Sequence, residues 1–182
     1  VIVEADGPIA QNEIAYINHD GTRMMAEVIK VVGNNANLQV FESTRGLVIG
    51  AEVEFQGHML EVVLGPGLLQ RNLDGLENDL DKMSGVFLKR GEYTFPLDEN
   101  KLWLFKPISK VGDKVSAGSW LGEVDENFQS HKIMVPFVTK GDYKIKSIAA
   151  EGEYNIYHTI AVIEDSEGNE TERFIYDSGL EL

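Results

Sequence analysis

The sequence predicts a mainly β fold made of two small barrel-like domains with a short helical connector between them. Over residues 1–64, short apolar runs alternate with turns rich in glycine and asparagine, which is typical of strands that reverse tightly. The same rhythm returns in residues 107–136, PISKVGDKVSAGSWLGEVDENFQSHKIMVP, where valines and leucines stand between glycine turns. Between these regions, leucines three and four residues apart predict a helix.

Residues 1–64 are predicted to form an antiparallel β-barrel. Residues 28–41 read VIKVVGNNANLQVF, and the asparagines beside Gly33 favour the left-handed turn of a hairpin. Residues 47–64 repeat the pattern around a turn at residues 56–58 and predict a second hairpin. About six short strands in so little chain favour a closed or partly closed barrel, because closure hides the sheet edges.

Residues 65–85 are predicted to be a connector with one short helix. The Gly-Pro-Gly sequence at its start ends the first domain, since proline cannot donate to a strand ladder. A helix is expected from Asn72 to Lys82, interrupted at Gly75, which costs about 1 kcal/mol relative to alanine. Its apolar stripe consists of Leu69, Leu73, Leu76, Leu80 and Met83.

Residues 86–165 are predicted to form the second β-rich domain, followed by a polar tail at residues 166–182. The expected turns are residues 141–142 and residues 151–153. In the stretch LWLF the two aromatic residues share one face of a strand and the two leucines the other, so we expect burial on both sides. The strands are expected within residues 86–91, 101–109, 131–138, 143–149 and 158–165.

Composition excludes several classes of function. The 16 basic and 30 acidic residues give a formal charge of −14, the wrong sign for binding a nucleic-acid backbone. With no cysteine, the chain has no disulfides, no thiolate metal site and no thiol catalysis. It lacks both a secretion signal and the roughly 20-residue apolar stretch that a membrane helix needs, so we expect a cytoplasmic protein without direct membrane insertion. Because the sequence starts at Val1, we expect a trimmed sequence or a fragment.

The sequence nominates no catalytic, cofactor-binding or metal-binding residue. The phosphate-binding pattern GxxxxGK[ST] is absent, as are GxGxxG, HExxH and GxSxG. The histidines stand in separate segments without metal-ligand spacing, and no pair of carboxylates is spaced for acid–base work. We therefore interpret the carboxylates as a solvated acidic surface. The four histidines are His19, His58, His131 and His158.

Lys132 is the residue for which a chemical role stays open. The glycine and valine pattern of residues 107–136 is similar to that of lipoyl and biotinyl carrier domains, in which a lysine at a hairpin tip carries the cofactor. Lys132 and Met134 fit that setting, whereas Ile133 and the Val-Pro pair that follows do not suit a tight turn. The alternative to a surface role for Lys132 is thus a carrier module modified on this lysine.

The order of several segments resembles the N-terminal third of the catalytic A subunit of V-type and archaeal-type ATPases. The resemblance covers roughly residues 1–170, including the early Gly7-Pro8. Locally the chain departs from the family: the arginine–proline pair expected after Asp74-Gly75 is missing, and HKIMVP is followed by FVTKG in place of a proline- and glycine-rich turn. The segments that carry the resemblance are ESTRGLVIGAEV, LGPGLL, NLDGL, FLKRG, KLWLFKPISKVGDKVSAGSWLGEV, HKIMVP and HTIAVIED.

The resemblance implies a non-catalytic N-terminal fragment that serves head assembly and stalk contacts. Its parts would be a β-barrel at residues 1–64, the connector at 65–85, an inserted barrel-sandwich domain at 86–165 and a tail leading toward a nucleotide-binding domain. ATP and Mg²⁺ would bind that absent domain, so this chain would hold no cofactor. The implied partners are B subunits and peripheral-stalk subunits, at the cytoplasmic face of a membrane. The parent would couple ATP synthesis or hydrolysis to proton or sodium transport.

Overall fold

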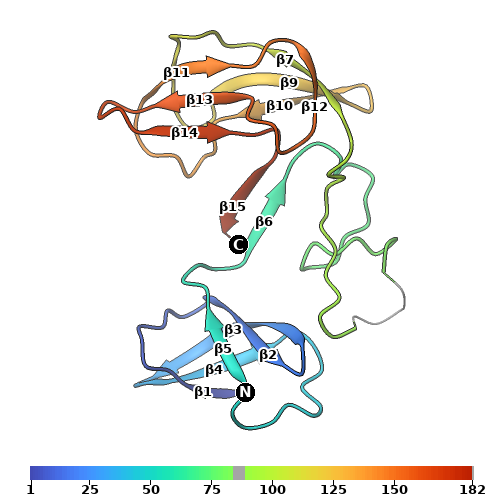
Figure 1. Ribbon diagram of the computed structural model, residues 1–182, viewed down its shortest axis with the longest axis vertical. Helices are drawn as coiled ribbons and strands as arrows, with labels where there is room; N and C mark the ends of the chain where they lie inside the picture. The colour runs from blue at the N-terminus through green and yellow to red at the C-terminus, as the bar shows by residue number, and fades with distance from the viewer. Residues whose placement is uncertain (84–88, 182) are drawn as a thin grey trace. The chain divides into compact units, whose positions relative to one another are not determined.

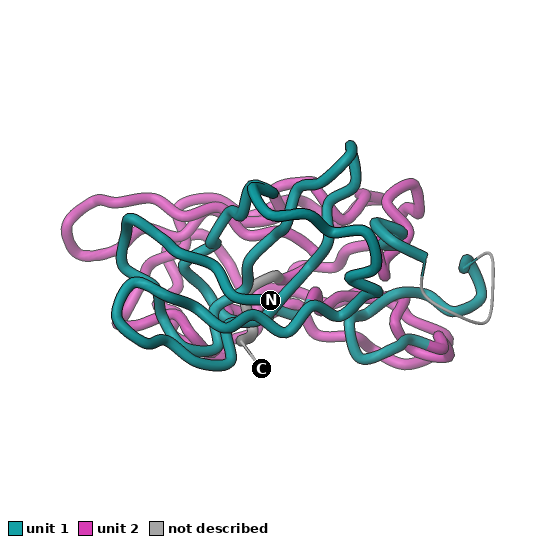
Figure 2. The backbone as a smooth tube through the Cα atoms, turned by 90° about the horizontal axis from the view of Figure 1, so that it is seen from below, with its two compact units in different colours: residues 1–62, 73–94, 181–182 teal, residues 63–72, 95–180 magenta. Residues whose placement is uncertain are grey.

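The computed structural model describes residues 1–83 and 89–181, and every regular element in them is a β-strand (Figure 1). The chain divides into two compact units, shown in two colours in Figure 2. The first unit comprises residues 1–62, 73–94 and 181–182, and the second comprises residues 63–72 and 95–180. The predicted mainly β fold is therefore confirmed. The described residues contain no helix long and apolar enough to cross a membrane.

The first unit is built on a five-stranded antiparallel sheet in the order β1-β4-β3-β2-β5. Its buried face carries small and medium apolar residues, among them Ala15, Ile17, Met24 and Ala26, none of which is exposed to solvent. The alternation of buried and exposed positions along the strands follows the period of two of a sheet with one face on a core. The strands are β1 (Ile2–Glu4), β2 (Ile14–His19), β3 (Thr22–Val32), β4 (Asn35–Val40) and β5 (Glu52–Phe55).

One of the two predicted hairpins forms and the other does not. Strands β3 and β4 pair antiparallel across Gly33, whose φ of 60° suits the turn. The predicted pair at residues 47–64 yields β5 and β6 (Glu61–Leu64), but β5 pairs with β2, while β6 pairs with β15 (Asp177–Glu181). The hairpin prediction was wrong because local turn signals do not report which distant strand offers the better partner.

The predicted helix at residues 72–82 was also wrong, because a side chain competes there with helical hydrogen bonding. The Asp74 carboxylate accepts hydrogen bonds from the backbone N–H groups of Leu76 and Asn78, both at 2.8 Å. Aspartate favours such local turns over helices. Glu77 has a φ of 61°, outside the helical range, and Leu73 forms an isolated bridge with Asp79.

The second unit contains two four-stranded sheets with the orders β10-β9-β7-β12 and β14-β13-β11-β8. All of their recorded strand pairs are antiparallel. One apolar core serves the unit, with Phe105, Leu121, Ile145 and Ile163 almost fully buried. The strands are β7 (Trp103–Pro107), β8 (Lys114–Val115), β9 (Trp120–Glu126), β10 (Gln129–Met134), β11 (Tyr143–Ile148), β12 (Gly152–Tyr154), β13 (Ala161–Glu164) and β14 (Glu170–Arg173).

Strand β7 buries one face, not two. Trp103 and Phe105 point into the core with exposed fractions of 3% and 0%, as the alternation predicts, but Leu102 and Leu104 are exposed. The Phe105 ring fits because Gly122 lies opposite: a Cβ atom there would sit 2.2 Å from the ring.

Two further segments differ from their predicted structure. The turn expected at residues 151–153 is instead the start of β12, which pairs with β7. The strand expected at residues 86–91 has its first three residues outside the described part of the chain, and the remaining three do not form a strand.

Candidate functional site

The glycine-rich loop that follows β6 is fixed in the second unit by one buried carboxylate. Glu126, at the end of β9, is 2% exposed and accepts hydrogen bonds from the backbone N–H groups of Gly67 at 2.5 Å and Leu69 at 3.3 Å. Its second oxygen lies 3.0 Å from Nδ1 of His131. A buried carboxylate with three donors is well satisfied, so Glu126 is a structural residue that holds this loop against the sheet.

The two glycines of this loop are required by close packing. A Cβ atom at Gly65 would lie 2.9 Å from Leu97 Cδ1 and 3.2 Å from Tyr176 Cβ. Gly67 has a φ of 108°, which L side chains rarely adopt, and it lies against the Trp103 ring. The Gly-Pro-Gly motif therefore serves the backbone and does not mark a ligand-binding loop.

Lys132 lies in the middle of β10, opposite Glu123 on β9, and forms an ion pair with it. Its ammonium is also 5.2 Å from the centroid of the Trp120 ring, and its side chain is 28% exposed. The tip of this hairpin is formed by Asn127 and Phe128, both at positive φ. A cofactor-carrying lysine needs a free amine at a hairpin tip, so this placement disfavours the carrier alternative.

A groove of about 560 Å³ lies within the second unit, beside β10 and along the segment that continues β14. Its apolar floor includes Ile133 and Ile175, which are 4% and 3% exposed. It is bordered by Met134, Phe137, Phe174 and Tyr176, and the rings of Phe174 and Tyr176 stack with centroids 5.9 Å apart. A cavity of this size and lining is suited to binding.

One cation at the groove has an N–H without an acceptor in the described part of the chain. Arg173, the last residue of β14, is half-buried, and its Nε–H is buried without a hydrogen-bond acceptor among the described residues. Burial lowers the pKa of its guanidinium, although the charges of Asp177 and Tyr143 act in the opposite direction. This N–H is itself enclosed by the protein, so it adds a cost of burial and offers no contact to a ligand.

The sequence prediction missed the groove residues because residues 166–182 were expected to be a tail. The signal was present in the run ERFIY, in which an arginine stands beside three apolar or aromatic residues. An arginine followed by such a run, next to a β-rich region, is compatible with an edge strand whose cation faces a groove. The other side of the groove is lined by β10, about forty residues earlier in the chain, and no local sequence pattern reveals this pairing.

The histidines contact different partners. His131 contacts Glu126, His158 stacks on Tyr154 with ring centroids 4.3 Å apart, and His58 lies 3.6 Å from Glu61. No group of three or more metal-binding side chains occurs in residues 1–83 and 89–181.

The interpretation of the carboxylates as a solvated surface was wrong for four of them. Glu13, Glu42, Asp79 and Glu126 are at most 8% exposed. Carboxylates can be buried at tolerable cost where backbone N–H groups surround them, and sequence spacing does not reveal this. Glu13, for example, accepts from the N–H groups of Ala10 at 2.7 Å and Gly57 at 2.8 Å.

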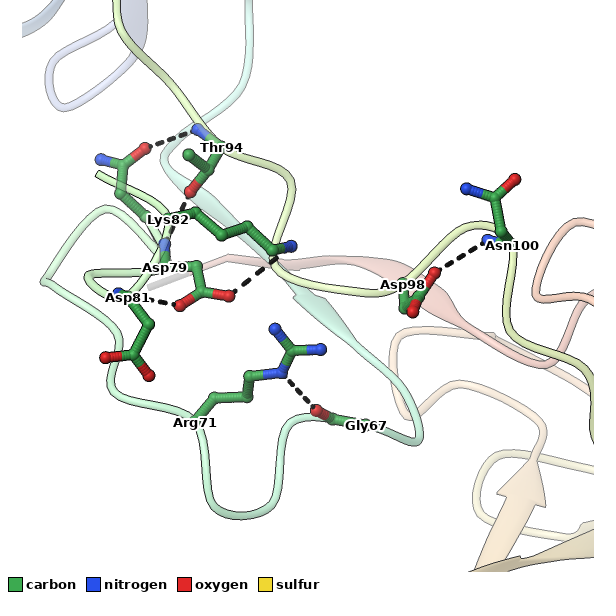
Figure 3. Close-up of polar contacts among 9 residues, drawn as sticks. Gly67, Arg71, Asp79, Asp81, Lys82, Thr94, Asp98 and Asn100 are labelled. Carbon is green, nitrogen blue, oxygen red and sulfur yellow. Dashed lines mark hydrogen bonds and ion pairs between the residues drawn. The ribbon is translucent and has the colours of Figure 1, made fainter. Parts of the chain in front are cut away.

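Two of these carboxylates hold the non-strand segments of the first unit. Glu42 accepts hydrogen bonds from the Gly91 N–H, at 2.8 Å, and from the Tyr93 hydroxyl. Burial and this hydrogen bond raise the pKa of Tyr93 above its ordinary range. Asp79, drawn in Figure 3, accepts from the N–H of Asp81 at 3.1 Å and lies 3.5 Å from Lys82 Nζ.

Comparison with known proteins agrees with this architecture. Residues 1–57 match the β-barrel domain of the ATP synthase alpha/beta family, and residues 94–177 match the barrel-sandwich domain of the ATP synthase alpha/beta subunit. The V-type ATP synthase alpha chain of Borreliella afzelii is 46% identical over 171 residues, and that of Borrelia recurrentis is 44% identical over the same length. The protein of that name from Chlamydia abortus is 45% identical over 170 residues.

These alignments cover 92% of this chain but only 29–30% of each relative, so the chain spans about a third of their length. The two matched domains occur in the order that the sequence resemblance implied. Each lies largely in one of the two compact units, the first in the unit that holds β1 to β5 and the second in the unit that holds β7 to β14. The chain belongs to the ATP synthase alpha/beta family and carries the β-barrel domain and the barrel-sandwich domain of that family.

Proposed function

We propose that this chain supplies the non-catalytic N-terminal domains of a V-type ATP synthase alpha subunit and serves assembly of the soluble head. The observation that carries the proposal is the combination of the two family domains, in order, with a sequence that lacks GxxxxGK[ST]. ATP and Mg²⁺ bind outside these residues in this proposal. The parent protein couples ATP synthesis or hydrolysis to transport of protons or sodium.

The two domains have different tasks in this proposal. The barrel, residues 1–64, contacts neighbouring B subunits of the head, and the inserted domain, residues 86–165, contacts peripheral-stalk subunits. The connector at residues 65–85 and the segment at 166–182 link them to the rest of the subunit. The assembled complex places both domains at the cytoplasmic face of the membrane. The acidic surface, with a formal charge of −14, favours basic surfaces on these partners.

Native mass spectrometry of the full chain mixed with the B subunit and the stalk subunits tests the assembly role. We expect a complex with at least one of them, and charge-reversing substitutions on the exposed face of the bound domain should weaken it. The same preparation, cleared of contaminating ATPases, should not hydrolyse ATP. Complex formation with neither subunit class, or ATP turnover that co-purifies with the chain, would contradict the proposal.

The carrier alternative is tested separately by intact mass after co-expression with biotin and lipoate ligases. Because Lys132 is paired with Glu123 within a strand, we expect no cofactor adduct. An adduct that disappears in Lys132→Arg and persists in Lys140→Arg, an exposed lysine of the same unit, would establish the carrier role.

A further inference from the structure

The first unit contains three Asp-Gly pairs, which begin at Asp6, Asp20 and Asp74. In such a pair the side-chain carboxyl carbon and the backbone nitrogen of the glycine can close a five-membered ring, since glycine has no side chain that shields this nitrogen. A Cβ atom on the glycine of any of the three pairs would meet nothing within 4 Å. The glycine is thus open in every pair, and the setting of the aspartate decides which pair reacts.

The carboxylate of Asp74 is held in place by three N–H donors. Its Oδ1 accepts hydrogen bonds from the backbone N–H groups of Leu76 and Asn78, both at 2.8 Å, and its Oδ2 accepts one from the side-chain amide of Asn78 at 3.0 Å. Before the Gly75 nitrogen can reach the carboxyl carbon, the carboxyl group must rotate away from these donors. Each hydrogen bond that is lost in this rotation raises the barrier to ring closure.

The aspartate of the β2–β3 turn has no comparable restraint. Asp20 and Gly21 form this two-residue turn, with φ values of 49° and 73°. The Asp20 side chain is 88% exposed, and its one recorded partner among the described residues is His19, whose Nε2 lies 3.3 Å from Oδ2. A single contact this exposed to solvent restrains the carboxyl group little.

The aspartate after β1 is equally free. Asp6 and Gly7 are both exposed and lie in an irregular segment. No hydrogen bond or ion pair of the Asp6 carboxylate is recorded within residues 1–83 and 89–181. Two of the three pairs therefore combine an open glycine with a mobile carboxyl group.

We propose that Asp6 and Asp20 are sites of aspartate isomerisation and that Asp74 is protected from it. The glycine nitrogen bonds to the side-chain carboxyl carbon and loses its proton, while that carbon loses its hydroxyl group, so one water leaves and a cyclic succinimide remains. Addition of one water then breaks either of the two ring C–N bonds to a carbonyl carbon. The products are aspartate and isoaspartate, in which the main chain runs through the side-chain carbon. The proposal holds whether or not the chain has the assembly role described above.

Isomerisation at Asp20 should have the larger structural consequence. Isoaspartate adds one carbon to the backbone of a turn of only two residues, and this turn sets the register of β2 against β3. Strand β2 also pairs with β5, so a displaced β2 affects both of its neighbours. Asp6 instead follows β1, which lies at the edge of the sheet. Isoaspartate at Asp20 should therefore weaken the first unit more than isoaspartate at Asp6.

Incubation of the full chain in water labelled with heavy oxygen, followed by peptide mass spectrometry, tests the proposal. Each passage through the ring leaves one solvent oxygen in the residue, and electron-transfer fragmentation distinguishes isoaspartate from aspartate. In the folded chain Asp6 and Asp20 should gain label at least about tenfold faster than Asp74, because only Asp74 must first lose hydrogen bonds. In the chain unfolded by guanidinium chloride, the three rates should agree within about threefold, because those bonds are gone.

Two matched variants assign the label to its site. Asp20→Glu should remove the label at that position and leave Asp6 unchanged, since a glutamate would have to close a six-membered ring and reacts far more slowly. Asp6→Glu should do the reverse. Amide exchange in β2 and β3 shows whether each variant is folded.

Two results would overturn the proposal. The first is a rate at Asp74 in the folded chain that equals the rate at Asp6 or Asp20. The second is an exposed aspartate that gains no label in the folded chain under conditions in which it reacts in the unfolded chain. In the latter case the fold protects that pair as well, and exposure of the carboxylate does not decide the outcome.

Discussion

The two units fill their cores in different ways. In the first unit, Ala15, Ala26 and Ala36 are buried beside medium-sized side chains, so the interior is made of small groups. In the second unit, the core contains the rings of Trp103 and Phe105. Small side chains leave little volume to lose, whereas a buried ring depends on a shaped space around it. The second unit should therefore be the more sensitive to changes of core volume.

The units resemble each other in how they hold their irregular segments. Glu42 in the first unit and Glu126 in the second each accept at least two hydrogen bonds from a segment distant in sequence. Glu126 has three donors and 2% exposure, whereas Glu42 has two donors and 8% exposure. In both units a buried carboxylate thus holds a distant segment. The more deeply buried one, Glu126, should contribute more to the free energy of unfolding.

Truncation of the central ring should give the largest effect. Phe105→Ala removes a fully buried ring and should lower the free energy of unfolding of the second unit by about 3–5 kcal/mol. Hydrogen exchange measured strand by strand should show the loss at β7 and β9, with β2 and β3 of the first unit unchanged. Leu104→Ala, its exposed neighbour, should change stability by less than about 0.5 kcal/mol. Equal loss in both units would show that they unfold as one.

Removal of the buried carboxylates should give the next largest effect. Glu126→Ala leaves the N–H groups of Gly67 and Leu69 and the His131 ring without their acceptor, and should cost about 3 kcal/mol. Glu42→Ala should cost about 2 kcal/mol, since fewer and less buried donors lose their partner. Urea unfolding curves would give both values.

Glu123→Ala is the control for this pair, because Glu123 lies on the same strand as Glu126 but outside the core. It should change the free energy of unfolding much less than Glu126→Ala does, because both partners of its ion pair with Lys132 stay in contact with solvent. A cost at Glu42 equal to or above that at Glu126 would contradict the relation between depth and stability.

The sequence predicted strands well where local patterns decide the outcome. The hairpin of β3 and β4 follows from its turn residues, and the burial of Trp103 and Phe105 follows from their alternation. The prediction failed where a side chain forms a local bond that the pattern does not contain. Asp74 accepts two backbone N–H groups and prevents the helix that the leucine spacing predicted at residues 72–82.

The binding groove and the buried carboxylates were beyond local patterns for a related reason. Glu126 has the same local appearance as the partly exposed Glu123, and the approach of the loop at residues 67–69 distinguishes them. The groove is lined by residues of β10 and β14, which belong to different sheets, so neither strand's own pattern can reveal it. Resemblance to a family supplied the order of domains but not these contacts.

Alkaline pH should weaken both units, through one tyrosine in each. Burial and hydrogen bonding to Glu42 raise the pKa of Tyr93, and hydrogen bonding to Glu99 raises the pKa of Tyr157 to about 12. Because an unfolded tyrosine has a pKa of about 10, the stabilisation is fully present below about pH 10 and is lost as pH rises toward the folded values. Denaturant unfolding from pH 8 to 12 should show this decline.

Phenylalanine variants assign the alkaline decline to each unit. Tyr93→Phe should flatten the pH dependence of the first unit, and Tyr157→Phe that of the second, with the smaller change at the exposed Tyr157. Tyr143→Phe, a tyrosine without a carboxylate partner among the recorded hydrogen bonds of the described residues, is the comparison variant. An identical slope in the parent and Tyr93→Phe proteins would contradict the assignment.

The smallest expected effect is a gain, at the tip of the β9–β10 hairpin. The β3–β4 hairpin turns through Gly33, whereas this hairpin turns through Asn127 and Phe128, with φ values of 53° and 66°. A left-handed backbone is unfavourable for a bulky residue, and Asn-Gly is the preferred sequence for such a turn. The Phe128 side chain is fully exposed, so its removal sacrifices no burial.

Phe128→Gly should therefore raise the free energy of unfolding of the second unit by about 0.5–1 kcal/mol. This gain is smaller than the full cost of a left-handed phenylalanine, because glycine also has more conformational freedom in the unfolded chain. Gly33→Phe, the reciprocal change in the first unit, should lower stability by about 1 kcal/mol. Thermal unfolding of both variants makes the comparison. A loss of stability in Phe128→Gly would mean that the exposed ring contributes to folding after all, and that the two hairpins differ in more than the residue at the turn.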